Sequence, residues 1–207
     1  MFANPRGYGL YPLASPLCHY YIDWRMKRLE LLMDAQALDR ALTRITHEIL
    51  ERNPDLKNFG IVGMQTRGVY LARRIVDKIN SLEKKDFKAG VLDITLYRDD
   101  YRNVFKQPQV QVTDIPFDLT GINMVLVDDV LYTGRTVRAA LDALVDFGRP
   151  KSIQLAVLID REHREMPIRA DYVGKGVSTQ TNQEVALKVQ EIDDEDSVWL
   201  MGLEKGD

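Results

Sequence analysis

The fold is decided by residues 125–136, which read VLVDDVLYTGRT. An apolar run closes on Asp128 and Asp129, a polar turn follows at residues 133–136, and apolar residues then recur at helical spacing over residues 137–144. A short apolar run bounded in this way is typical of a buried strand, and the periodic stretch is typical of an amphipathic helix. The sequence therefore predicts a strand, a polar loop and a helix, which together are half of a βαβ unit.

The loop between this strand and helix has the features of an anion site. Backbone N–H groups at a helix start attract negative charge, and Gly134 lets the main chain approach a phosphate closely. Asp128 and Asp129 come where the strand ends, at the edge where open parallel sheets bind ligands. Because side chains alternate along a strand, at least one carboxylate points toward the interior and needs a partner. We therefore predict a ligand that carries both hydroxyl groups and phosphate.

Two other interpretations of this stretch are weaker. The aspartates could simply leave the sheet for solvent while Thr133 caps the helix. A Walker-type phosphate loop is excluded, because its glycine spacing is missing and no lysine follows Gly134.

The pattern at residues 127–136, hydrophobic-Asp-Asp-x-x-x-Thr-Gly-x-Thr, resembles the signature for 5-phosphoribosyl-1-pyrophosphate (PRPP) of the type I phosphoribosyltransferases. The resemblance is closest to the pyrimidine operon regulators of that family, which are uracil phosphoribosyltransferases that also bind RNA. Matching stretches lie at residues 64–72, 93–100, 113–117, 154–161 and 163–175, and the resemblance covers about residues 26–202.

This resemblance implies an α/β fold with a central, mainly parallel sheet flanked by helices, a small hood over the strand ends and a mobile hairpin loop. It implies that uracil and PRPP give UMP and pyrophosphate, with Mg²⁺ bridging pyrophosphate and ribose oxygens. C1 of the ribose becomes oxocarbenium-like as pyrophosphate leaves, so positioning and charge stabilisation are needed rather than a covalent nucleophile. It also implies a homodimer or a larger homo-oligomer.

The resemblance also assigns site residues by position. Asp128 and Asp129 would lie on the ribose side of the site. They are also the candidates for contacts with Mg²⁺. The rest of the PRPP and UMP site would be Val130, Leu131, Tyr132, Thr133, Gly134, Arg135 and Thr136, the last four around the 5′-phosphate. Pyrophosphate would be held by Thr66, Arg67 and Gly68, and by Arg98 with Arg102 as a second candidate. Taken alone, Thr-Arg-Gly is more often an ordinary turn.

Periodicity places these residues on predicted elements. Helices are expected from Asp34 to the Asn53-Pro54 stop and over residues 69–79. Strands are expected over residues 59–64, 91–97, 153–159, 184–189 and 198–201, the last two capping the sheet. The polar segment 98–121 is long for a connection in a compact domain, so we expect a lid over the site or a hairpin arm there. A solvated hairpin without a function would have the same sequence pattern.

The strand at residues 153–159 delivers a charged loop to the edge that carries the two aspartates. By resemblance, this region borders the uracil pocket and an RNA-binding surface, and its candidates are Arg161, His163, Arg164 and Arg169. From the residues alone, an ordinary solvated loop with a surface histidine is the simpler interpretation.

Length and composition favour one compact soluble domain. The 207 residues are 45% hydrophobic, and no linker-like stretch divides them. Residues 1–25 are rich in proline and aromatic residues without a period, so we expect a flexible extension followed by a phosphoribosyltransferase domain at residues 26–207. No apolar run is long enough for a membrane span and no secretory pattern is present, which favours a cytoplasmic location. The single cysteine, Cys18, excludes a disulfide framework.

The charge is unevenly distributed along the chain. Residues 191–207 hold seven acidic residues and one lysine, so residues 1–190 carry +3 although the whole chain carries −3. A local basic face for RNA therefore remains possible. Two alternatives stay open: a purine-type phosphoribosyltransferase without an RNA role, and an RNA regulator with little catalysis.

Overall fold

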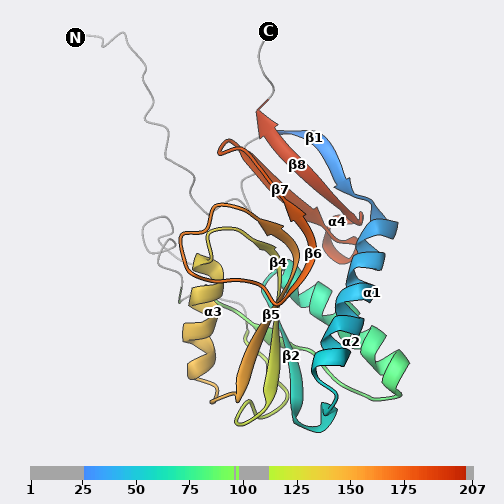
Figure 1. The fold of residues 1–207 in the computed structure, drawn as a ribbon, viewed down its shortest axis with the longest axis vertical. Helices are drawn as coiled ribbons and strands as arrows, with labels where there is room; N and C mark the ends of the chain where they lie inside the picture. The colour runs from blue at the N-terminus through green and yellow to red at the C-terminus, as the bar shows by residue number, and fades with distance from the viewer. Residues whose placement is uncertain (1–25, 96, 98–111, 204–207) are drawn as a thin grey trace, which may run out of the picture.

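The computed structural model describes residues 26–95, 97 and 112–203 of the chain (Figure 1). The predicted extension at residues 1–25 lies outside the described residues. So do Arg98, Arg102 and most of the predicted lid.

The central sheet has five strands in the order β3-β2-β4-β5-β6, and every pair is parallel. Its strands are β2 (Phe59–Met64), β3 (Gly90–Leu92), β4 (Asn123–Leu131), β5 (Ser152–Arg161) and β6 (Tyr172–Val177). All residues of β2 and most of β4 are buried, as expected for parallel strands that are covered on both faces. The predicted α/β fold is confirmed.

Helices cover both faces of this sheet (Figure 1). They are α1 (Ala35–Arg52) and α2 (Arg67–Glu83) on one face and α3 (Arg135–Val145) on the other, with a short 3-10 turn, η1 (Leu56–Asn58), before β2. Strand side chains alternate between the faces: Ile61 and Val125 pack in the cluster of α1 and α2, whereas Val62 and Leu126 pack in the cluster of α3. None of the described helices is both long and apolar enough to cross a membrane.

A second sheet forms the hood, which lies at the end of the molecule where α1 begins (Figure 1). It is antiparallel in the order β1-β8-β7, with β1 (Met26–Met33), β7 (Gln183–Lys188) and β8 (Ser197–Leu203), and the short helix α4 (Gln190–Asp193) joins β7 to β8. The two strands predicted near the C-terminus are confirmed. They do not cap the central sheet by pairing with it, however, because they pair with each other and with β1.

One predicted strand is too long. Strand β3 ends at Leu92 instead of continuing to Tyr97, because the Asp93 carboxylate accepts hydrogen bonds from the Thr95 amide at 2.9 Å and the Thr95 hydroxyl at 2.6 Å. Such a local side-chain bond replaces the ladder bonds of a strand with a turn. In contrast, β4 continues past the predicted apolar run, so Asp128 and Asp129 lie within the strand rather than after it.

The first helix follows its predicted boundaries closely. The Asp34 side chain caps α1 by accepting from the Ala37 amide at 2.7 Å, and the Asn53 side chain donates to the Ile49 carbonyl at 2.9 Å where the helix ends. Asn53 also donates to the Gln154 side chain of β5 at 2.9 Å. The end of α1 is thereby fixed to the central sheet.

The contribution of β1 to the hood can be measured by truncation. Deleting residues 1–33 removes the strand that pairs with β8, whereas deleting residues 1–25 leaves it in place. We expect the longer deletion to lower the free energy of unfolding by about 2 kcal/mol relative to the shorter one, since β8 keeps its pairing with β7 but loses its pairing and side-chain contacts with β1. Urea denaturation followed by circular dichroism compares the two proteins. Equal stabilities would mean that β1 adds nothing to the hood.

Candidate active site

Two buried carboxylates lie within β4, close to its carboxyl end. Asp128 and Asp129 are each 5% exposed. One oxygen of Asp128 accepts from the Asp129 amide at 2.9 Å, and one oxygen of Asp129 accepts from the Val130 amide at 2.8 Å. These local bonds orient both carboxylates at the edge where the strand gives way to the loop.

The predicted phosphate loop follows directly. Gly134 has a φ of +91°, which favours glycine, and an added Cβ would come within 3.0 Å of Met166 Cβ. The Thr133 carbonyl accepts from the Glu165 and Met166 amides at 2.9 and 3.0 Å, so the loop after β5 supports this turn. Because α3 starts at Arg135, its first amides meet this loop, as an anion site requires.

The remaining predicted residues of this loop lie around it. Val130 and Tyr132 are half-buried, Leu131 is buried, and Thr133 and Thr136 are half-buried. Arg135 forms an ion pair with Glu165 at 2.6 Å.

The loop between β2 and α2 reaches the same edge. Thr66 precedes the first turn of α2, and the Gln65–Thr66 peptide bond is cis. Gly68 lies so close to β4 that an added Cβ would be 2.6 Å from the Val127 carbonyl oxygen and 3.2 Å from Asp128 Cα. The structure thus brings the predicted pyrophosphate loop directly against the strand that carries the two aspartates.

Arg67 has a partner that the sequence did not predict. Its guanidinium donates to Asp193 at the end of α4, from Nε at 3.2 Å and from Nη2 at 3.0 Å. Their side chains are 15% and 10% exposed. The hood therefore meets the pyrophosphate loop at a largely buried ion pair.

On the other side of the edge, Arg161 stacks on an aromatic ring. Its guanidinium carbon lies 3.8 Å from the centre of the Tyr132 ring, and Tyr132 meets the ring of His163 edge to face at 6.4 Å. Arg161 is 5% exposed and donates to the Thr179 hydroxyl at 2.7 Å. Arg161 is therefore a buried side chain held by Tyr132 and Thr179, and it is not part of an exposed surface.

His163 also has an unusual backbone. Its φ is +74°, which is uncommon for a residue other than glycine, and its Nε2 lies 3.0 Å from the Thr179 carbonyl oxygen. Non-glycine residues in this conformation are concentrated at binding sites.

Arg164 ties the loop after β4 to the loop after β5. Its guanidinium donates to four backbone carbonyls and one carboxylate, those of Leu131, Tyr132, Arg161, Ile168 and Asp160. The bond to the Tyr132 carbonyl is 2.7 Å long. Since Nε, Nη1 and Nη2 all have acceptors within the chain, Arg164 positions these two loops and is poorly placed to present charge to RNA.

Arg169 differs from Arg164 in its surroundings. It is exposed, and no hydrogen bond or ion pair joins its side chain to any of the described residues. It lines a cavity of about 600 Å³ together with His163 and Arg164. Of the predicted basic candidates, Arg169 is the one whose charge faces solvent beside this cavity.

These parts are those of a phosphoribosyltransferase. Residues 30–192 match the family model of the phosphoribosyl transferase domain. The chain is similar to the Bifunctional protein PyrR of Thermus aquaticus, with 59% identity over 169 residues, 82% of this chain and 93% of that protein. It is 55% identical to the Bifunctional protein PyrR of Pelotomaculum thermopropionicum over 170 residues, 82% of this chain and 94% of that protein. The chain belongs to the PyrR family of phosphoribosyltransferases.

Solved structures agree on the fold. A hypoxanthine phosphoribosyltransferase from Staphylococcus aureus superposes with a TM-score of 0.63, covering 86% of this chain and 94% of that one. At 16% identity this likeness concerns the fold alone.

Replacing Gly68 by alanine tests the contact between the two loops. The added Cβ would meet the backbone of β4 at 2.6 Å, so α2 must move away from the aspartates. We expect a loss of about 2 kcal/mol in unfolding free energy and about a hundredfold lower phosphoribosyl transfer. Gly176→Ala is the matched control, because nothing lies within 4 Å of a Cβ added there. Equal behaviour of the two variants in urea denaturation and in the activity assay would contradict the contact.

Proposed function

We propose that the chain transfers the phosphoribosyl group of PRPP to uracil, giving UMP and pyrophosphate, and that it attenuates transcription of a pyrimidine biosynthesis operon by UMP-dependent binding of leader RNA. The observation that carries the enzymatic half is the meeting of Asp128, Asp129 and the loop at residues 133–136 with Gly68 at one edge of the sheet. Similarity to proteins named bifunctional PyrR supports the regulatory half and favours uracil over a purine base.

The reaction needs charged and polar groups held in place at both ends of the ribose, around the 5′-phosphate and around the pyrophosphate that leaves C1. The amides at the start of α3 would hold the 5′-phosphate, and Asp128 and Asp129 would accept hydrogen bonds from the ribose hydroxyls. Their negative charge also favours the positive charge that develops at C1. Arg67, together with Arg98, would bind the pyrophosphate that leaves.

The donor set also fits Mg²⁺. Among the described residues no three side chains are grouped as a metal site, but Mg²⁺ commonly takes one or two carboxylates and completes its shell with substrate phosphates and water. Asp128 and Asp129 are such carboxylates. Bound there, the ion would neutralise pyrophosphate and ribose oxygens.

The regulatory half has a physical basis in Arg164. One guanidinium binds the carbonyls of both Tyr132, in the phosphate loop, and Arg161, at the start of the loop that leads to Arg169. A nucleotide that orders the phosphate loop would therefore also order the second loop, whose exposed arginine is our candidate RNA contact. UMP would favour RNA binding through this connection.

A homodimer or larger homo-oligomer belongs to the same proposal. Val145, the last residue of α3, and Phe147, two residues beyond it, are 75% and 46% exposed. Exposed apolar side chains of this kind are typical of protein interfaces.

The enzymatic half is tested by replacing Asp128 and Asp129 together with asparagine. The change keeps the shape of both side chains but removes their charge, so we expect UMP synthesis to fall at least about a hundredfold while folding hardly changes. Asp142→Asn, on the exposed side of α3, is the control and should retain activity. Wild-type protein should use uracil rather than hypoxanthine or guanine. Near-normal UMP synthesis by the double variant would refute the assignment.

The regulatory half is tested by titrating the protein with its pyrimidine leader RNA, with and without UMP, at two salt concentrations. Arg169→Gln should weaken RNA binding and lower the slope of its salt dependence by about one unit, the contribution of one phosphate contact, while UMP synthesis should be reduced less than RNA binding. Arg164→Gln should reduce both activities, because it separates the two loops. Arg149→Gln is the control. It removes the same charge from an exposed residue that precedes β5, at the opposite edge of the central sheet. Equal salt slopes for wild type and Arg169→Gln would reject the RNA role of Arg169.

A further inference from the structure

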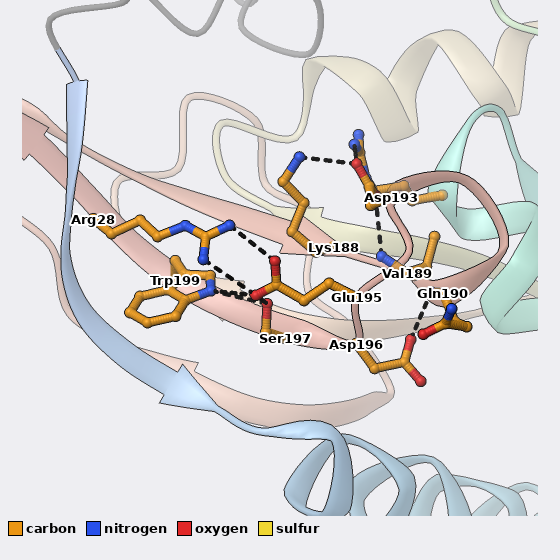
Figure 2. Close-up of polar contacts among 10 residues, drawn as sticks. Arg28, Lys188, Val189, Gln190, Asp193, Glu195, Asp196, Ser197 and Trp199 are labelled. Atoms are coloured by element: carbon orange, nitrogen blue, oxygen red, sulfur yellow. Dashed lines mark hydrogen bonds and ion pairs between the residues drawn. The ribbon is translucent and has the colours of Figure 1, made fainter.

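The acidic segment that precedes β8 is not an open negative surface. Its side chains bind cations of other elements: Glu191 and Asp196 pair with Arg74 of α2, Glu195 pairs with Arg28 of β1, and Asp193 pairs with Arg67 of α2. Figure 2 shows this segment with the side chains of Asp193, Glu195 and Asp196 directed toward different partners. The segment therefore docks the hood onto α2 through two arginines seven residues apart, which places them on one face of that helix.

Both carboxylate oxygens of Asp193 have two hydrogen-bond donors each. Its Oδ1 accepts from Arg67 Nη2 at 3.0 Å and from Lys188 Nζ at 2.9 Å, and its Oδ2 accepts from Arg67 Nε at 3.2 Å and from the Val189 amide at 3.0 Å. The bonds from Lys188 and Val189 are visible in Figure 2. Burial alone would raise the pKa of Asp193, but the bonds from Arg67, Lys188 and Val189 outweigh it and hold the pKa below its usual value. The group is thus a carboxylate at neutral pH.

This arrangement fixes Arg67 without using all of its donors. Asp193 binds the guanidinium from the side, through Nε and Nη2, and so sets the plane of the group. For Nη1 no acceptor is found among the described residues. Arg67 precedes Gly68, which touches β4 beside Asp128, so the held guanidinium stands at the edge where the leaving group is expected.

Asp193 also brings a second cation to this place. Lys188 and Arg67 donate to the same carboxylate oxygen, at 2.9 and 3.0 Å, so two positive groups that would repel one another are held together. The three side chains together carry a charge of +1. A largely buried cluster of this charge suits an anion.

We propose that Asp193 is a positioning residue for the leaving group, holding Arg67 and Lys188 as a cationic pair that binds pyrophosphate and coupling the hood to the pyrophosphate loop. The proposal rests on the proposed function, since it takes the Arg67 loop as the pyrophosphate site. It adds two residues of the hood, Asp193 and Lys188, to the groups that control the reaction.

A purely structural role is the competing explanation, and the chain offers a matched control for it. Asp196 belongs to the same segment and also pairs with an arginine of α2, at 2.8 Å, but its partner Arg74 lies two helical turns away from the site. Asp196→Asn therefore weakens the docking of the hood without touching Arg67. Asp193→Asn weakens the docking and releases Arg67.

The experiment titrates the full chain with inorganic pyrophosphate and Mg²⁺ by calorimetry, and measures KM for PRPP and for uracil. For Asp193→Asn we expect pyrophosphate affinity to fall about tenfold and KM for PRPP to rise similarly, with KM for uracil nearly unchanged. Asp193→Glu should restore part of the affinity, and Lys188→Gln should weaken it with the fold intact. Asp196→Asn should bind pyrophosphate as wild type does.

Three outcomes would overturn the proposal. They are unchanged pyrophosphate affinity in Asp193→Asn, an equal loss in Asp196→Asn, and, if Asp193→Asn does not fold, unchanged affinity in Lys188→Gln. Failure of the proposed function is a separate result, because wild-type protein would then make no UMP from uracil and PRPP, whatever the variants bind.

Discussion

The edge of the central sheet that carries Asp128 and Asp129 depends on β4, which is held by hydrogen bonds from β2 on one side and β5 on the other. A strand paired on both sides and covered on both faces cannot move without breaking the sheet. Two carboxylates can therefore be buried at its end, each oriented by a backbone amide, in positions that a flexible loop could not maintain. Ligand chemistry of the kind proposed here needs this rigidity, because positioned charge does most of the work.

Three contacts bring the surrounding loops to this fixed strand. Gly68 allows α2 to touch the β4 backbone, Arg164 joins the loop after β4 to the loop after β5, and Asp193 joins the hood to Arg67. Each contact links segments that are far apart in sequence, up to 126 residues for Arg67 and Asp193. In this account the phosphate, base and pyrophosphate parts of the site form one connected structure, so a ligand at one part affects the others.

The sequence predicted the parts of the molecule that are governed by local patterns. The apolar runs gave β2, β4 and β5, and the Asp-Asp and Thr-Gly pattern located the loop that precedes α3. Strand β1 was missed because five of its eight residues are exposed, and only pairing with β8 makes it a strand. Strand β3 was predicted too long, since the bonds from Thr95 to the Asp93 side chain end it.

The roles of individual charged residues were harder to predict than the elements. Arg164 was expected on an RNA surface, but it binds carbonyls of two loops, an arrangement that depends on the tertiary fold. The acidic run at residues 191–196 was visible in the sequence, as was the seven-residue spacing of Arg67 and Arg74. No local rule indicated that these groups pair, because the hood must first fold back onto α2.

A crystal structure of the chain with bound UMP tests the central claim most directly. We expect phosphate oxygens within hydrogen-bonding distance of the amides at residues 134–136, ribose hydroxyls at Asp128 and Asp129, and the uracil ring on the side of Tyr132 and Arg161. A nucleotide bound elsewhere, or bound at this edge with its phosphate away from the loop before α3, would contradict it.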